Sequence, residues 1–210
     1  CKLDHERSFC DKVIMSCHKL KYLTEPSRER ILARARKTGT LADVGAKYDG
    51  CVVKDPRFSV TLPAWREQTC VENVLYMFRH PYAVTSSFKK YFGIPRWLGY
   101  RLWTYHVNSF LESADGVKLT VVSYDNFFSE GADVEAERLA KFLGAGYERV
   151  HQVLSEVVCD TERHHRSARA RVPRRIENVH QKLCHLHAAH DSPTIYTSSD
   201  SPRHGREASA

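Results

Sequence analysis

Two runs of β-branched and aromatic residues, each followed by a helical pattern, constrain the fold of this chain most. They are residues 72–78 (ENVLYMF) and residues 117–124 (VKLTVVSY), and both have the length and composition of strands. A shorter apolar run at residues 51–53 (CVV) follows the turn signal Asp-Gly at residues 49–50 and ends before Pro56, which predicts a third, buried strand. Strands that alternate with helices are typical of an α/β fold with a mostly parallel sheet.

Helical periodicity fills most of the remaining chain. Glycines support two of the helix ends, because Gly93 and Gly144 each follow a helical stretch. The predicted helices cover residues 2–23, 27–39, 81–92, 98–113, 134–143, 147–158 and 173–189. From Asp191 onward the chain is rich in Ser, Pro, Asp, Arg and Gly and has almost no apolar residues. These patterns predict one α/β domain over residues 1–190 and a disordered tail over residues 191–210.

The net charge of +7 is concentrated at the two ends of the chain. Residues 1–48 hold 11 Lys and Arg against 6 Asp and Glu, residues 49–160 hold 12 against 14, and residues 161–210 hold 9 against 5. Basic flanks suit an anionic ligand, a nucleic acid or an acidic polymer, and solvated helix faces explain them equally well. The flanks do not interleave basic with aromatic residues on one face, so no nucleic-acid partner is expected.

The cysteines and the hydropathy of the chain predict where in the cell the protein is located. Seven cysteines are scattered along the chain without a C-x-x-C pair, and their odd number favours free thiols in a reducing compartment, which predicts a cytoplasmic protein. No stretch approaches the roughly 18–20 apolar residues that span a bilayer, so no transmembrane segment is expected. The start, CKLDHERSFC, has no signal-peptide pattern, and because it begins with Cys1 rather than Met, we expect the true N-terminus to lie upstream.

Residues 79–87 (RHPYAVTSS) form the most informative short segment. Arg79 stands at the end of a predicted strand, Pro81 opens a predicted helix, and Ser87 lies two turns into that helix. The first turn of a helix presents unpaired N–H groups and a partial positive charge, which attract anions. A guanidinium group adds bidentate contacts to phosphate oxygens. The segment therefore indicates either an anion site or a strand–helix junction with a structural arginine.

This segment resembles the 3′-phosphate-binding motif of sulfotransferases that use 3′-phosphoadenosine 5′-phosphosulfate (PAPS). In that family an arginine and a serine eight positions later hold the 3′-phosphate of the nucleotide, and Arg79 and Ser87 have that spacing. Pro81 and Val84 also fit the motif between them. The resemblance implies that Arg79 and Ser87 bind the nucleotide.

Further segments resemble the bacterial-type members of this family. Residues 54–65 (KDPRFSVTLPAW) look like their strand-end K-D-P-R segment. Residues 122–127 (VSYDNF) and 136–144 (AERLAKFLG) are similar to a strand with a Tyr–acidic pair and to an FLG helix, and residues 163–166 (RHHR) resemble a basic C-terminal stretch. The matches cover residues 50–166 in the family's order. They imply a P-loop-NTPase-like, mostly parallel sheet flanked by helices.

The resemblance also implies roles for single residues. Lys54 would approach the transferred sulfuryl group or the bridging oxygen, where a compact charge stabilises the leaving group. Tyr124 would lie on the adenine side of the pocket, or it is a packing tyrosine. Small-molecule sulfotransferases place a catalytic histidine two residues after the matching lysine, where this chain has Pro56. The nearest carboxylate, Asp55, is the candidate base, or a turn and capping group.

The resemblance also gives expectations for three histidines. His80 is expected to be structural, because it adjoins the phosphate-binding arginine in the sequence. His164 and His165 are candidates for the acceptor site.

The family's N-terminal glycine-rich loop, whose backbone N–H groups hold the 5′-phosphosulfate, has no counterpart before Lys54. The first strand and this loop are therefore expected to be missing from an N-terminally truncated chain. The expected function is transfer of the sulfuryl group of PAPS to a hydroxyl acceptor, either a carbohydrate or a lipid. The alternative is a catalytically inactive or partial relative that retains binding of the nucleotide 3′-phosphate or of a partner.

Other chemistries have weaker support in the sequence. His180, Cys184 and His187 share one face of the last predicted helix and could ligate a metal, but a solvated or packed face is the simpler interpretation, and no metal is expected. A phosphoryl-transferring enzyme would need a Walker-type lysine loop and carboxylates for Mg²⁺, which the sequence does not show.

Overall fold

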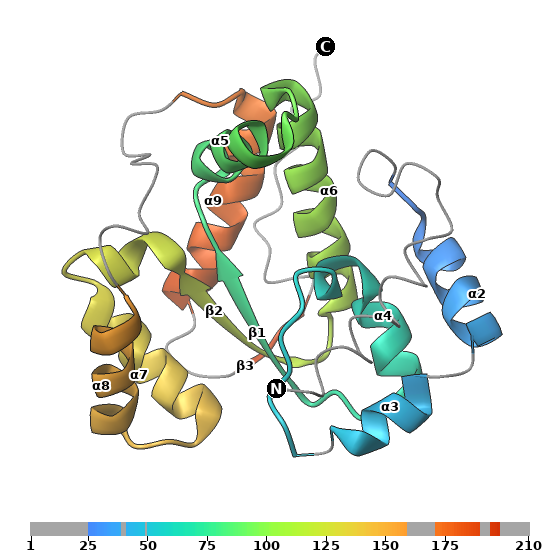
Figure 1. The fold of residues 1–210 in the computed structure, drawn as a ribbon, viewed down its shortest axis with the longest axis horizontal. Coiled ribbons are helices and arrows are strands. Elements are labelled where there is room, and N and C mark those ends of the chain that lie inside the picture. The colour runs from blue at the N-terminus through green and yellow to red at the C-terminus, as the bar shows by residue number, and fades with distance from the viewer. Residues whose placement is uncertain (1–24, 39–40, 49, 159–170, 190–193, 198–210) are drawn as a thin grey trace, which may run out of the picture.

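The computed structural model describes residues 25–38, 41–48, 50–158, 171–189 and 194–197. The fold is mixed α/β, mostly helical, with a small sheet at its centre (Figure 1). In chain order the elements are α2 (Arg28–Thr38), α3 (Leu41–Lys47), α4 (Phe58–Gln68), β1 (Asn73–Phe78), α5 (Pro81–Phe92), α6 (Arg96–Ser113), β2 (Lys118–Ser123), the 3₁₀ turn η1 (Tyr124–Phe128), α7 (Ala132–Leu143), α8 (Tyr147–Val157), α9 (Arg174–Ala189) and β3 (Thr194–Ile195).

The sheet has the order β1-β2-β3, with β1 parallel to β2 and β3 antiparallel to β2. The parallel pair runs from Asn73 opposite Lys118 to Phe78 opposite Ser123. Every residue of β2 after Lys118 is buried, because this strand is covered on both faces, as its β-branched composition leads one to expect. In Figure 1, α7 and α8 lie to the left of the sheet and α2, α3 and α4 to its right.

Two clusters of buried side chains hold these elements together. The larger one joins the sheet to α6 and α9, and its members include Phe78, Phe110 and Leu183. Tyr76 of β1 stacks on Phe110 of α6 with 3.9 Å between the ring centroids. The smaller cluster packs α2, α3 and α4 around Trp65. The sheet, and with it the carboxyl ends of β1 and β2, therefore rests on the larger cluster.

Most predicted elements lie where the sequence placed them. The helix predicted over residues 81–92 is confirmed as α5, and the strands predicted over residues 72–78 and 117–124 are confirmed as β1 and β2. The helix predicted over residues 2–23 lies outside the described residues. No helix in the described part of the chain is long and apolar enough to cross a bilayer.

The strand predicted over residues 51–53 is wrong. This segment is irregular, the side chain of Val52 is 70% exposed, and the backbone N–H of Cys51 donates to the carbonyl of Tyr48 in a turn. Three apolar residues between a Gly turn and a Pro are too few to require burial in a sheet. The chain instead enters α4, a helix that the sequence analysis missed because Pro63 stands inside it.

The tail prediction is also wrong for three residues. Thr194 and Ile195 pair with β2, and the side chain of Tyr196 is only 2% exposed in the larger core cluster. One aromatic side chain supplies enough apolar area to dock a polar segment. Apart from Thr197, which is exposed, the remainder of the predicted tail lies outside the described residues.

Candidate functional site

The candidate site is built at the carboxyl ends of β1 and β2. Because Phe78 pairs with Ser123 in a parallel register, the residues that follow them, Arg79 and Tyr124, are neighbours. In open α/β sheets this end of the strands is where ligands bind. The register thus brings together two of the residues that the sequence analysis singled out.

Arg79 lies between an aromatic ring and a carboxylate. Its guanidinium carbon is 4.5 Å from the ring centroid of Tyr124, a cation–π contact, and its Nε is 3.6 Å from Oδ1 of Asp125. Only 17% of the Arg79 side chain is exposed. Asp125 also accepts a hydrogen bond from the backbone N–H of His80 at 3.3 Å. The cation is therefore held in one orientation at the end of the sheet.

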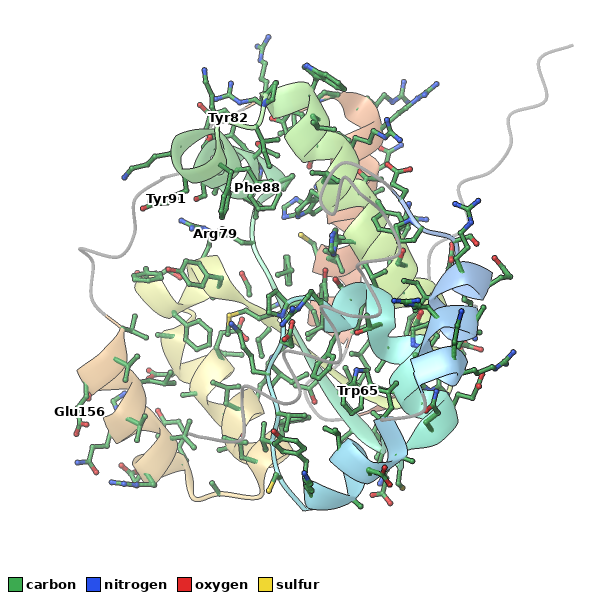
Figure 2. All side chains as sticks on the ribbon, turned by 45° about the vertical axis from the view of Figure 1, so that its right-hand side comes forward. Trp65, Arg79, Tyr82, Phe88, Tyr91 and Glu156 are labelled. Atoms are coloured by element: carbon green, nitrogen blue, oxygen red, sulfur yellow. The ribbon has the colours of Figure 1, made fainter. Side chains whose placement is uncertain are left out.

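Helix α5 begins immediately after this arginine. Pro81 occupies its first turn, and the N-cap His80 accepts a hydrogen bond through Nδ1 from the backbone N–H of Tyr82 at 3.3 Å. Ser87 lies half-buried on α5, about two turns from His80 and on the same face of the helix. Figure 2 shows Arg79 below α5, with Tyr82 and Phe88 on the helix. Arg79 and Ser87 thus come from the junction and the helix that the sequence predicted.

Lys54 is not placed as the sequence predicted, whereas Asp55 has the contacts of the turn and capping group that was the alternative to a catalytic base. Lys54 is exposed in the irregular segment before α4 rather than at the end of a strand. Asp55 is buried and accepts hydrogen bonds through Oδ1 from the backbone N–H of Arg57 at 2.9 Å and from Nε of Arg57 at 2.8 Å. Its Oδ2 is bonded to the second guanidinium arm of Arg57. These bonds are those of a turn and capping group.

The histidine-containing face of α9 is divided between two sets of contacts. His187 binds the buried Glu135 of α7, with 2.5 Å between Nε2 and Oε1, whereas His180 faces His80 with 4.9 Å between their ring centroids. Burial lowers the pKa of both His80 and His180 below its ordinary value, so both rings are neutral near pH 7. The face therefore does not act as a single set of ligands.

The chain offers another set of metal-ligating groups at this point. Ligand atoms of His80, Glu177 and His180 lie within 4.8 Å of one another. Nδ1 of His180 lies 3.9 Å from Oε1 of Glu177, whereas two ligand atoms that each lie about 2.0–2.1 Å from a tetrahedral zinc ion are only about 3.4 Å apart. Nδ1 of His80 is also engaged in capping α5 through Tyr82. We therefore assign no metal to these residues. The other candidates, His164 and His165, lie outside the described residues.

A partly buried Ser–His pair was missed by the sequence analysis. Oγ of Ser59 in α4 lies 2.6 Å from Nδ1 of His106 in α6, and burial lowers the pKa of His106 to about 4. The same hydroxyl lies 2.9 Å from the carbonyl of Pro56. The two residues are 47 positions apart, and neither stands in a recognisable motif, so no signal in the sequence could have paired them.

A hollow of about 740 Å³ lies elsewhere, between α2, α4, α6 and α9. None of Lys54, Arg79, Ser87 or Tyr124 lines it, so size alone would direct attention away from the strand ends. We give more weight to the strand ends, because a charged group is oriented there by two neighbours. A scan of protein-family models, and searches of curated proteins and solved structures, find no match to this chain.

Proposed function

We propose that this chain carries the nucleotide 3′-phosphate site of a PAPS-dependent sulfotransferase with a P-loop-NTPase-like fold. The observation that supports the proposal most is the position of Arg79, held against Tyr124 and Asp125 at the end of β1 and followed directly by α5. A guanidinium group beside the first turn of a helix suits a phosphate dianion. Arg79 would bind the 3′-phosphate, Ser87 would add a hydroxyl donor, and Tyr124 would lie beside the adenosine.

The reaction would transfer a sulfuryl group to a hydroxyl of a carbohydrate or a lipid. PAPS supplies the activated sulfur: the acceptor oxygen bonds to it as the bond to the 5′-phosphate oxygen breaks, and the acceptor proton leaves to a base. Catalysis of this kind depends on positioning and on stabilisation of the leaving oxygen. Exposed Lys54 is the proposed cation for that oxygen.

The contacts of Asp55 favour the second candidate function, nucleotide binding without catalysis. Both of its carboxylate oxygens bind Arg57, so protonating Asp55 during turnover would weaken a buried ion pair. A base from outside residues 54–57 is then required for transfer.

The sheet has an edge at which the strand with the family's glycine-rich loop could be added. The order β1-β2-β3 leaves β1 at an edge of the sheet that the described residues form. A further parallel strand that carries such a loop would add at this edge, next to the end of β1 where Arg79 lies. This arrangement supports the proposal that the chain contributes the 3′-phosphate half of a complete PAPS site.

Calorimetric titration with adenosine 3′,5′-bisphosphate tests the proposal. We expect Arg79→Ala to weaken binding by about 30-fold, since a hydrogen bond to a charged group contributes about 2 kcal/mol. Arg149→Ala, a change on exposed helix α8, is the matched control and should bind as the wild type does. Equal affinities of the wild type and Arg79→Ala would refute the assignment.

A further inference from the structure

The corner between α5 and α6 exposes aromatic side chains together with cations. Tyr91 is 56% exposed, Phe92 72% and Trp97 67%. Gly93, with φ of +67°, ends α5, and Pro95 precedes α6, so the three aromatic residues stand on either side of one tight turn. Isolated exposed apolar residues are ordinary, but a group of them around one turn indicates an interaction site.

Lys89, Lys90 and Arg96 accompany these rings, and we call the six residues the aromatic corner. Lys90 lies 5.1 Å from the ring centroid of Tyr91, and Arg96 lies 4.5 Å from that of Tyr82. Among the described residues, no salt bridge involves any of the three cations. Within that part of the chain, no neighbouring carboxylate therefore neutralises their positive charge.

The sequence around the corner is depleted of acidic residues. Between Glu72 and Glu112 there is no Asp or Glu, although the same stretch holds 5 Lys and Arg. β1, α5 and the part of α6 before Glu112 therefore contribute no carboxylate that would repel an anionic partner. Figure 1 shows α5 and the first turns of α6 at the upper end of the molecule, away from α3 and α8, and Figure 2 shows Tyr82 and Tyr91 on that end.

We propose that the aromatic corner docks the protein on the surface of a membrane that contains anionic phospholipid. Trp, Tyr and Phe insert between headgroups and the upper acyl chains, where an apolar ring with a polar edge is most stable. Each Lys or Arg beside an anionic leaflet strengthens binding roughly fivefold. The exposed rings favour a bilayer over a soluble polyanion without aromatic groups, because such a polyanion would bind only the cations and leave Phe92 and Trp97 in water. The proposal stands independently of the sulfotransferase assignment, since it uses neither Arg79 nor Ser87.

Tryptophan fluorescence with vesicles can test this directly. The chain has 3 tryptophans, of which Trp65 and Trp103 are buried and Trp97 is exposed, so Trp97 reports on insertion. With phosphatidylcholine vesicles that contain phosphatidylserine, we expect the full chain to sediment with the vesicles and its emission to shift to shorter wavelength. Pure phosphatidylcholine should produce neither effect. Trp97→Phe should abolish the shift while the protein still sediments.

Matched surface variants distinguish vesicle binding by the aromatic corner from vesicle binding by basic surface residues in general. Lys89→Gln with Lys90→Gln should weaken vesicle binding by roughly 25-fold, and Phe92→Ser should also weaken it, whereas Arg28→Gln with Arg30→Gln on exposed α2 should not. Circular dichroism should show unchanged folding in each variant. Three outcomes would overturn the proposal. The wild type could fail to bind the vesicles, or the α5 and α2 variants could lose equal amounts of vesicle binding. The wild type could also bind the soluble polyanion dextran sulfate as tightly as the vesicles while neither ligand shifts the tryptophan emission.

Discussion

Arg79 is oriented by two side chains that follow β2, and this contact fixes the cation before a ligand binds. The ring of Tyr124 covers one face of the guanidinium group, and Asp125 lies 3.6 Å from its Nε. Less side-chain entropy is then lost when an anion binds, which favours affinity. The carboxylate also reduces the local positive charge, so the proposed 3′-phosphate would bind in competition with Asp125.

His106 supplies a prediction that depends on pH. Burial lowers its pKa from 6.5 to about 4, so the folded protein keeps the ring neutral while the unfolded chain protonates it. The unfolded state thus binds more protons between these values, and stability falls as the pH drops below 6.5 and levels off below about 4. Between pH 7 and pH 5 the free energy of unfolding should decrease by about 2 kcal/mol from this group alone. Urea denaturation at several pH values measures the decrease.

His106→Gln is the variant that isolates this effect. His80 and His180 also have lowered pKa values and add a decrease in the same direction, so the variant should retain part of the pH dependence. An unchanged dependence in His106→Gln would show that this ring does not stay neutral in the fold.

At the scale of elements, periodicity predicted the two longer strands and most of the described helices, but it missed α3 and α4 and could not predict how elements are joined. The ends of β1 and β2 meet because parallel strands share an edge, so the neighbourhood of Arg79 and Tyr124 could be anticipated from order alone. The short apolar run at residues 51–53 carried too little information to distinguish a strand from an exposed connection. The Asp55–Arg57 fork and the Ser59–His106 pair depend on side-chain geometry that no motif encodes.

Glu135 of α7 provides a prediction about a side chain that joins several elements. It is fully buried and joins η1, α7 and α9, because its Oε1 accepts from Nδ2 of Asn126 at 2.7 Å and binds Nε2 of His187 at 2.5 Å. Glu135→Ala should lower the free energy of unfolding by about 3 kcal/mol, since it removes a fully buried side chain and leaves two partly buried polar partners unsatisfied.

Glu137 on the same helix is the matched control, because its exposed carboxylate makes an i,i+4 ion pair with Lys141 at 3.1 Å. Glu137→Ala should cost about 0.5 kcal/mol or less. Equal losses in thermal or urea denaturation of the two variants would contradict the role given to Glu135.

At the scale of the whole molecule, a segment near the C-terminus completes the larger core. Tyr196 is 2% exposed among residues of the sheet, α6 and α9, and its backbone N–H donates to the carbonyl of Val117. The core that supports the strand ends is therefore not complete before residue 196. Composition could not reveal this, because a single tyrosine hardly changes the average hydropathy of a polar stretch.

Tyr196→Ala should destabilise the full chain by about 3 kcal/mol, the cost of removing a large buried side chain. Ile195→Ala is the control: its side chain is 59% exposed, so the change should be within about 0.5 kcal/mol of the wild type. Chemical denaturation measures both, and a Tyr196→Ala protein as stable as Ile195→Ala would show that the segment does not dock.

The central claim is that Arg79 recognises a 3′-phosphate, and the affinity ratio of the wild type for adenosine 3′,5′-bisphosphate and adenosine 5′-monophosphate tests it most directly. The two ligands differ only in that phosphate. We predict that the bisphosphate binds about 10–100-fold more tightly and that Arg79→Ala removes most of this difference. Equal affinities of the wild type for the two nucleotides, or a preference that Arg79→Ala leaves intact, would contradict the account.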